Sequence, residues 1–324
     1  MLRFVLRRGA LVLPSLLGLL VVTFLLIHAV PSDPAVSMAG EGATPEQIAR
    51  LRQQYGLDKP VYIQYLRWMR LVVQGKFGMA LEWGRPVSEV IGDRLWLTMV
   101  VSVAAILLTW VVALPIGIYS AVRQYSVGDY IATFIGFIGL AVPSFMLALV
   151  LMYAGFKLFN LNVGGLFSDE LAQAPWSWAK VWDLVKHLPL PAVILALAGT
   201  AQLIRIMRAN LLDELRKPYV VSARARGLSE RRVILKYPVR VALNPFASTV
   251  GYLLPYVVSG SIIVSLVLSL PTVGPLLLRA LIAQDMFLAG TIVLLLGVMT
   301  VVGTFISDLV LMWIDPRIRL EGRK

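Results

Sequence analysis

Long stretches without a charged residue dominate this sequence and limit what it can fold into. Most of them exceed the roughly 20 residues that an α-helix needs to cross a bilayer. Hydrocarbon offers no hydrogen-bond partners, so a chain placed there must satisfy its backbone within helices. We therefore predict an all-α polytopic membrane protein with about six transmembrane helices. The charge-free stretches are residues 9–32, 95–122, 130–156, 188–204, 246–278 and 286–307.

The basic residues near the ends of these stretches predict the orientation. Arg3, Arg7 and Arg8 precede the first stretch, Arg123 follows the second, and further clusters occupy 205–240 and 317–324. By the positive-inside rule all of these segments are cytoplasmic, and so are both termini. Residues 31–94, 157–187 and 271–285 then face the other side. The net charge of +12 accordingly indicates topology and membrane lipid, and we expect no nucleic acid partner.

We expect a single transmembrane domain over residues 1–324. Its first helix, 9–30, follows a basic start like that of a signal peptide, but the apolar run is longer than a signal sequence uses, which predicts a retained helix. An extracytoplasmic loop with short helices fills 31–94. A core of five helices follows over 95–315, interrupted by a cytoplasmic loop at about 211–245.

The outer loop carries two helix signals. Thr44, Pro45 and Gln47 match a capping box with proline at the first helical position, and Gly56 supplies a stop. A second helix begins at Pro60, and its apolar face is formed by Val61, Tyr65, Leu66, Met69 and Val73. Both roles remain open for these helices, lying on the membrane interface or docking a partner.

The most polar part of the core is "SARARGLSERR", residues 222–232. Pro218 suits a helix start, Gly227 suits a left-handed helix end because it lacks a Cβ, and Ser229 suits the cap of the next helix. Pro238 ends or kinks that second helix. The pattern predicts a helix-glycine-helix hairpin on the cytoplasmic side. A basic loop that only fixes topology and touches anionic lipid is the alternative.

The run "YVVSARARGLSERRVILKYPVRVALNP" resembles the cytoplasmic loop of binding-protein-dependent ABC importer permeases, in the dipeptide, oligopeptide and nickel subgroup. The matching residues are Ala223, Arg224, Ala225, Arg226, Gly227 and, after eighteen more positions, Pro245. Six further segments, spread in order along almost the whole chain, resemble the same subgroup: "MLRFVLRR", "PSDPA", "LRQQYGLDKP", "VPSF", "LPTVGPLLLRALIAQD" and "DPRIR". Two departures are Val221, where the wider superfamily often has glutamate, and Pro238, which falls inside the second short helix.

The resemblance implies the fold of a type I ABC importer permease in the bacterial plasma (inner) membrane. It implies a subunit that forms half of a translocation path for di- or oligopeptides, with a nickel chelate or another small solute as the alternative cargo. The implied partners are a homologous second permease, two ABC ATPase subunits and an extracytoplasmic solute-binding protein. Residues Ala223 to Leu228 are then expected to contact an ATPase: Ala223, Arg224, Ala225, Arg226, Gly227 and Leu228.

The sequence lacks motifs for nucleotide binding, metal binding and hydrolysis, so we expect a transport subunit and not an enzyme. No P-loop motif occurs, because "QGKFG" at 74–78 lacks the first glycine and the hydroxyl. ATP and Mg²⁺ are therefore expected on partner subunits, and no cofactor in this chain. There is no cysteine, and His28 and His187 are too far apart in sequence to indicate a metal centre or a serine hydrolase. A Ser–Lys pair is not excluded by spacing, although no motif supports it.

A stand-alone secondary transporter is the less favoured alternative. Carriers coupled to protons or sodium usually place ionisable groups deep in their spans, and here only Asp308 lies within an apolar run, where helix packing also accounts for it. The predicted fifth span carries serines at four-residue spacing, which places them on one helix face. We predict that Ser259, Ser261 and Ser265 line the solute path, although small-residue helix packing fits this stripe equally well.

Overall fold

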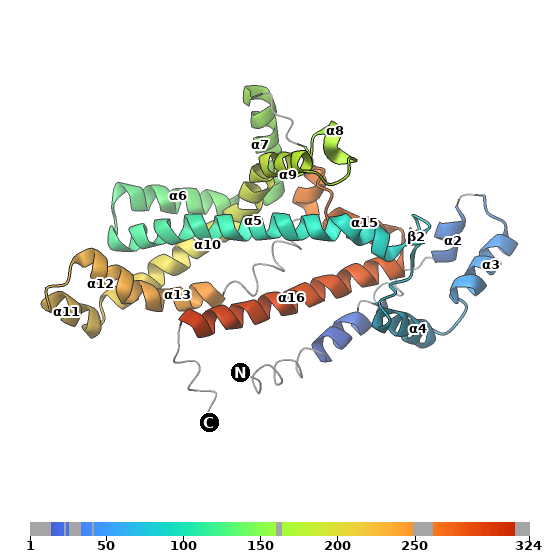
Figure 1. The fold of residues 1–324 in the computed structure, drawn as a ribbon, viewed down its shortest axis with the longest axis horizontal. Helices are drawn as coiled ribbons and strands as arrows, with labels where there is room; N and C mark the ends of the chain where they lie inside the picture. The colour runs from blue at the N-terminus through green and yellow to red at the C-terminus, as the bar shows by residue number, and fades with distance from the viewer. Residues whose placement is uncertain are drawn as a thin grey trace. The chain divides into compact units, whose positions relative to one another are not determined.

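The computed structural model describes residues 14–22, 24–25, 34–40, 42–159, 164–248 and 262–314, and these are helical nearly throughout (Figure 1). This confirms the predicted all-α class. The elements named in Figure 1 are α2 (Pro34–Ala39), α3 (Pro45–Tyr55), α4 (Val61–Val73), α5 (Val87–Val122), α6 (Val127–Ala141), α7 (Ser144–Phe159), α8 (Asp169–Ala172), α9 (Trp178–His187), α10 (Pro189–Leu215), α11 (Pro218–Ala225), α12 (Glu230–Lys236), α13 (Pro238–Ser248), α15 (Val273–Ile282) and α16 (Met286–Ile314). Strands β1 (Met79–Ala80) and β2 (Arg85–Pro86) pair antiparallel, with Met79 opposite Pro86.

Three helices in the described part of the chain are long and apolar enough to cross a membrane: Val87–Val122, Pro189–Leu215 and Met286–Leu309. Helices α6 and α7 make a fourth span if counted together, bent by 108° at the break that contains Pro143. Proline has no amide hydrogen and excludes the helical conformation from the residue before it, which accounts for the break. The predicted first and fifth spans lie partly outside the described residues, so the count of six and the orientation stay predictions.

Backbone contacts divide the chain into two compact units. One comprises Met1–Thr98 and Pro271–Met299, and the other comprises Met99–Leu270 and Thr300–Lys324. We call them the loop unit, which contains the predicted outer loop, and the core unit, which contains the predicted cytoplasmic loop. The expectation of one domain with the boundaries given above stays a prediction.

The loop unit confirms both helix signals, since α4 follows Pro60 and Tyr65 and Met69 of its predicted apolar face pack against the core. The Thr44 hydroxyl accepts the Gln47 N–H and the Gln47 side chain accepts the Thr44 N–H at 2.9 Å, as a capping box requires. In α4, however, the buried residue is Trp68, 2% exposed, while Leu66 and Val73 of the predicted apolar face are 61% and 82% exposed. The Trp68 indole is the buried side chain because it has the largest apolar area and because a glycine lies opposite it. A Cβ at Gly290 would meet the Trp68 ring at 3.2 Å.

The core unit is organised around α10, which contacts α6, α7, α9 and α13. Leu203, Met207 and Leu211 are fully buried along one side of α10. Helix α5 approaches closely, because a Cβ on Gly117 would lie 2.7 Å from the Cβ of Met207. Asp129 at the start of α6 is 3% exposed and is paired with a cation from α10.

Candidate functional site: the basic hairpin

The polar stretch folds into the predicted helix-glycine-helix hairpin, formed by α11 and α12. Pro218 is at the start of α11, where its missing N–H costs no hydrogen bond. Gly227 has φ +73° and its N–H donates to the Arg224 carbonyl at 2.9 Å. Ser229 occupies the cap position of α12 with extended backbone angles, although its side chain makes no cap hydrogen bond. The left-handed angle at Gly227 is one that a side chain disfavours.

The hairpin has a small apolar core of its own. Val220 and Val233 are fully buried, Ala223 is 6% exposed, and Leu228 and Tyr237 pack around them. The Ala223 side chain therefore faces this core, and its expected contact with an ATPase stays a prediction. A small residue is needed there because α11 and α12 approach each other, so the surface that remains for a partner starts at the following residues.

An ion pair that sequence reasoning missed closes the hairpin across its turn. The Arg224 guanidinium donates to both carboxylate oxygens of Glu230, with Nη2–Oε1 at 2.6 Å and Nε–Oε2 at 3.1 Å. The hydrogen bond from Arg224 lowers the pKa of the Glu230 carboxyl. Arg224 is one of the residues expected to contact an ATPase, and its guanidinium pairs within the chain. The sequence does carry a signal for this ion pair: Arg224 and Glu230 have opposite charges and lie on either side of the helix-ending Gly227.

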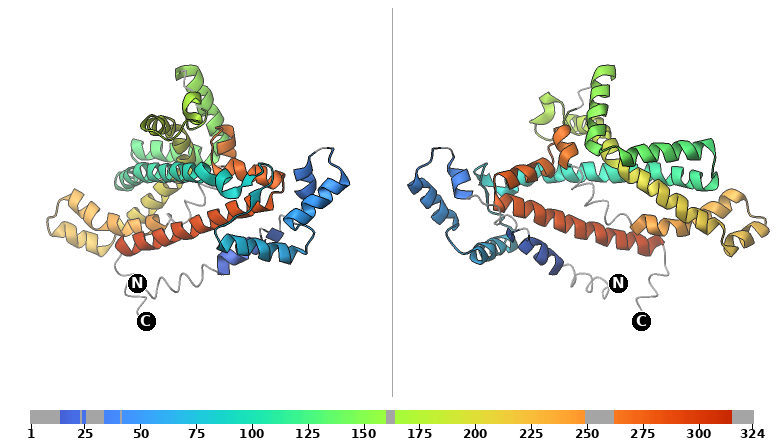
Figure 2. Two further views of the ribbon diagram at one scale, coloured as in Figure 1. Left: turned by 45° about the vertical axis from the view of Figure 1, so that its right-hand side comes forward. Right: turned by 180° about the vertical axis from the view of Figure 1, so that it is seen from behind.

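The second helix anchors the hairpin to the apolar helices. Ile234 of α12 is 8% exposed and belongs to the cluster that includes Met207 and Leu211 of α10 and Val239 of α13. Pro238 is the first residue of α13 and not inside α12, which ends at Lys236. The views in Figure 2 agree in placing α11, α12 and α13 together beside the end of α10. The second helix of the hairpin is therefore in side-chain contact with both α10 and α13.

The outer surface of the hairpin is basic and has free space at its tip. Arg226, Arg231 and Arg232 are exposed. No atom lies within 4 Å of the position that a Cβ on Gly227 would take. The hairpin thus presents a glycine-tipped knob whose immediate surroundings are not filled by the described part of the chain. Exposed residues of the predicted contact set are Arg224, Ala225, Arg226 and Gly227, with Leu228 half-buried.

Comparison with known proteins gives this geometry its context. Residues 113–320, which contain the hairpin, match the family described as "Binding-protein-dependent transport system inner membrane component", and residues 1–102 match the N-terminal region of the same membrane components. The chain belongs to this family. It is thus a multi-pass inner membrane permease of a transport system that depends on a binding protein.

The relatives cover almost the entire permease. Oligopeptide transport system permease protein AppB of Bacillus subtilis is 34% identical over 316 residues, 97% of this chain and 98% of that relative. Dipeptide transport system permease protein DppB of Escherichia coli K12 is 32% identical over 336 aligned residues, 98% of this chain and 99% of that relative. A putative peptide permease protein of Brucella ovis is 32% identical, covering 99% and 100%.

The serine stripe of the permease is only partly visible. Ser259 and Ser261 lie outside the described residues, and Ser265 is fully buried, with no hydrogen-bond partner for its hydroxyl among the described residues. Ser265 therefore does not face an open surface in the described part of this chain, and its role in the path stays a prediction. Its carbonyl accepts the Leu270 N–H at 2.8 Å, so it helps to end its own helix. A role of Ser259 and Ser261 in the path stays a prediction.

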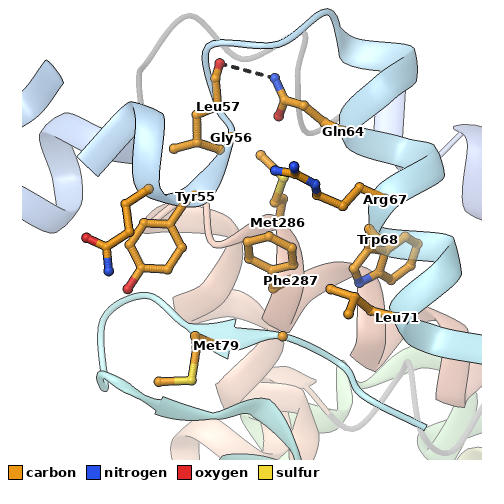
Figure 3. A pocket seen from close by; sticks show the side chains of 12 residues that line it. Tyr55, Gly56, Leu57, Gln64, Arg67, Trp68, Leu71, Met79, Met286 and Phe287 are labelled. Carbon is orange, nitrogen blue, oxygen red and sulfur yellow. Dashed lines mark hydrogen bonds between the residues drawn. The ribbon is translucent and has the colours of Figure 1, made fainter. Parts of the chain in front are cut away.

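The loop unit contains a cavity of about 220 Å³ between α3, α4 and the start of α16 (Figure 3). Figure 3 shows Phe287 facing the cavity, with Arg67 and Trp68 of α4 along one side. The Gln64 amide donates to the carbonyls of Leu57 and Lys59 at 3.2 and 2.8 Å, which fixes the turn between α3 and α4. The two short helices thus form a hollow surface together with the start of β1 and the start of α16.

A buried carboxylate holds this loop unit together. Asp285, fully buried before α16, accepts the Leu288 N–H at 2.9 Å and the Leu81 N–H at 2.5 Å. The first bond caps α16, and the second ties the β1–β2 turn to that helix start. Burial raises the pKa of Asp285 to about 6, against the lowering effect of these hydrogen bonds. The group therefore titrates near neutral pH.

Proposed function

We propose that this chain is one permease subunit of an ATP-driven importer and forms half of its translocation path for di- or oligopeptides. The names of the relatives, an oligopeptide and a dipeptide transport system permease protein, support the peptide cargo. A homologous second permease, two ABC ATPase subunits and an extracytoplasmic solute-binding protein complete the assembly. The chain itself is not an enzyme: it has no P-loop, so ATP and Mg²⁺ are bound by the ATPase subunits.

The observation that carries the proposal is the glycine-tipped knob with its link to α10. Coupling needs an element that moves as one piece and shares packed side chains with the spans. The hairpin meets both needs, because Val220, Ala223 and Val233 make it a packed body and Ile234 joins the cluster of α10 and α13. An ATPase that closes on ATP would push the knob and shift α10 and α13 together.

In this mechanism Ala225, Gly227 and Leu228 seat in a cleft of one ATPase subunit. Arg226, Arg231 and Arg232 flank that cleft and pair with its acidic groups. Arg224 keeps the turn closed through Glu230 and acts on the partner only through the position of the tip. The glycine matters most, because a side chain there points into space that the chain leaves empty.

The test compares three variants of the complete importer in proteoliposomes. Gly227→Trp adds bulk at the tip, and Gly227→Asn adds a side chain that tolerates left-handed angles. Gly75→Trp is the matched control, because Gly75 has φ +74° and also has no atom within 4 Å of its Cβ position, yet lies in the loop unit. We expect Gly227→Trp to insert normally but to lose ATP-driven uptake by about tenfold or more, Gly227→Asn to lose less, and Gly75→Trp to retain uptake.

Two results would contradict the proposal. Wild-type uptake by Gly227→Trp would leave the hairpin as a topology signal, and equal loss in Gly75→Trp would assign the effect to backbone strain. The cargo is tested separately by identifying what the cognate binding protein carries. A labelled dipeptide or oligopeptide is expected, and a bound nickel chelate would remove the peptide assignment while leaving the permease intact.

A further inference from the structure

A basic cavity lies between α6 and α10 in the core unit, on a side of α10 that the hairpin does not use. It measures about 250 Å³. Its apolar lining combines small residues, among them Gly136 and Ala201, with Phe137 and Ile204, and its polar lining is Arg205, Arg208 and Thr133. Such a site combines room for hydrocarbon with donors for an anion.

The two arginines are held differently. Arg208 donates through Nε and Nη2 to the carboxylate of Asp129 at 3.0 and 2.9 Å, so its charge is balanced and its position fixed. Arg205 is exposed and has no ion pair with any described acidic residue. Because residues three apart on a helix are neighbours, Arg205 adds an uncompensated positive charge beside the fixed guanidinium of Arg208. No acidic side chain lines the cavity.

The depth of this end of the cavity matches a lipid headgroup. With a rise of about 1.5 Å per residue, Arg205 and Arg208 lie about 24 and 28 Å along α10 from Pro189. A hydrocarbon core is about 30 Å thick, so a helix that enters at Pro189 brings both guanidinium groups to the opposite headgroup level. The positive-inside prediction makes that level the cytoplasmic leaflet, where anionic lipids attract arginine.

We propose that the cavity between α6 and α10 is a binding site for an anionic phospholipid of the cytoplasmic leaflet. The phosphate accepts hydrogen bonds from Arg205 and from the remaining Nη1 of Arg208, since guanidinium groups suit phosphate oxygens. An acyl chain follows the small residues Gly136 and Ala201 towards the bilayer centre. A transmembrane helix of a partner would instead have to bring a carboxylate to the hydrocarbon edge, which is costly. The proposal does not depend on the nature of the cargo.

The test is native mass spectrometry of the complete importer, purified in detergent and offered phosphatidylglycerol or phosphatidylcholine with identical acyl chains. Arg205→Gln removes the uncompensated charge without disturbing Asp129. Gly136→Leu fills the apolar part, and a Cβ there meets only Ala201, at an ordinary 3.7 Å. Arg216→Gln is the matched control, because Arg216 is exposed at the end of the same helix and does not line the cavity.

We expect phosphatidylglycerol to be retained over phosphatidylcholine by the wild type and by Arg216→Gln. Arg205→Gln should lower retention about fivefold, which is the effect of one arginine near an anionic surface, and Gly136→Leu should lower it comparably. Equal retention of both lipids by the wild type would overturn the proposal, as would an equal loss in Arg216→Gln. So would efficient cross-linking of Thr133→Cys to the second permease, because a protein would then occupy the cavity.

Discussion

Replacing Asp285 with asparagine tests how the loop unit is held together. The carboxylate accepts N–H groups from Leu81 and Leu288, which are far apart in the sequence. Burial raises its pKa from 3.8 to about 6, and the nearby charge of Glu82 adds to this rise. The asparagine side chain has nearly the same shape, but it cannot ionise. Its single carbonyl oxygen replaces only one of the two carboxylate oxygens that accept these N–H groups.

The size of the effect follows from the two pKa values. Between 3.8 and about 6 the folded chain holds a proton that the unfolded chain releases, so the free energy of unfolding falls as the pH rises through this window. Between pH 5 and pH 7 this linkage amounts to about 1.3 kcal/mol. The loop unit should therefore be more stable at pH 5 than at pH 7, and Asp285→Asn should remove that difference.

Hydrogen exchange of the peptides that contain Leu81 and Leu288, corrected for the intrinsic pH dependence of exchange, measures this directly. Protection in the wild type should increase about ninefold from pH 7 to pH 5, and it should not change with pH in Asp285→Asn. Asp58→Asn, an outer-loop carboxylate outside this contact, should keep the wild-type response. Protection that rises with pH, or a response that survives in Asp285→Asn, would refute the assignment of the effect to this carboxylate.

Two further predictions concern the ion pair of the hairpin and the contact between Gly78 and Phe287 in the cavity of the loop unit. In a double-mutant cycle, Arg224→Ala and Glu230→Ala should show a coupling of only about 0–1 kcal/mol in the free energy of unfolding, because the pair is about half exposed. A coupling above about 2 kcal/mol would show instead that this ion pair dominates the stability of the hairpin. Gly78→Ala should destabilise the loop unit by about 1–3 kcal/mol more than Gly75→Ala in thermal unfolding, because a Cβ on Gly78 meets Phe287 at 2.8 Å and one on Gly75 meets nothing. Equal shifts in melting temperature would disprove that contact.

Local signals predicted the hairpin correctly. Pro218, Gly227 and Ser229 each constrain the backbone within one or two residues, so their effect can be read without knowing what packs on them. The same is true of the capping box at Thr44. The general fold class also followed directly, because charge-free length is a property of the sequence alone.

Contacts between distant segments could not be predicted in this way. Asp285 binds Leu81 across 204 positions, and Asp129 binds Arg208 across 79, so neither carboxylate carries a local sign of its partner. Trp68 is the buried residue of α4, beside Tyr65 and Met69 of the predicted face, because a glycine from α16 lies against its ring. Helical periodicity identifies an apolar face, but the surface opposite decides which of its residues are buried.

Inter-subunit cross-linking at the hairpin tip tests the central claim most directly. The chain has no cysteine, so Arg226→Cys provides a single thiol on the exposed tip, and Gln74→Cys provides an exposed control in the loop unit. In the assembled importer a short bifunctional reagent should join Arg226→Cys to an ATPase subunit, with a yield that changes when ATP is trapped, while Gln74→Cys gives no such product. If Arg226→Cys gives no ATPase adduct in a complex that transports peptide, the hairpin is not the surface that receives the ATPase.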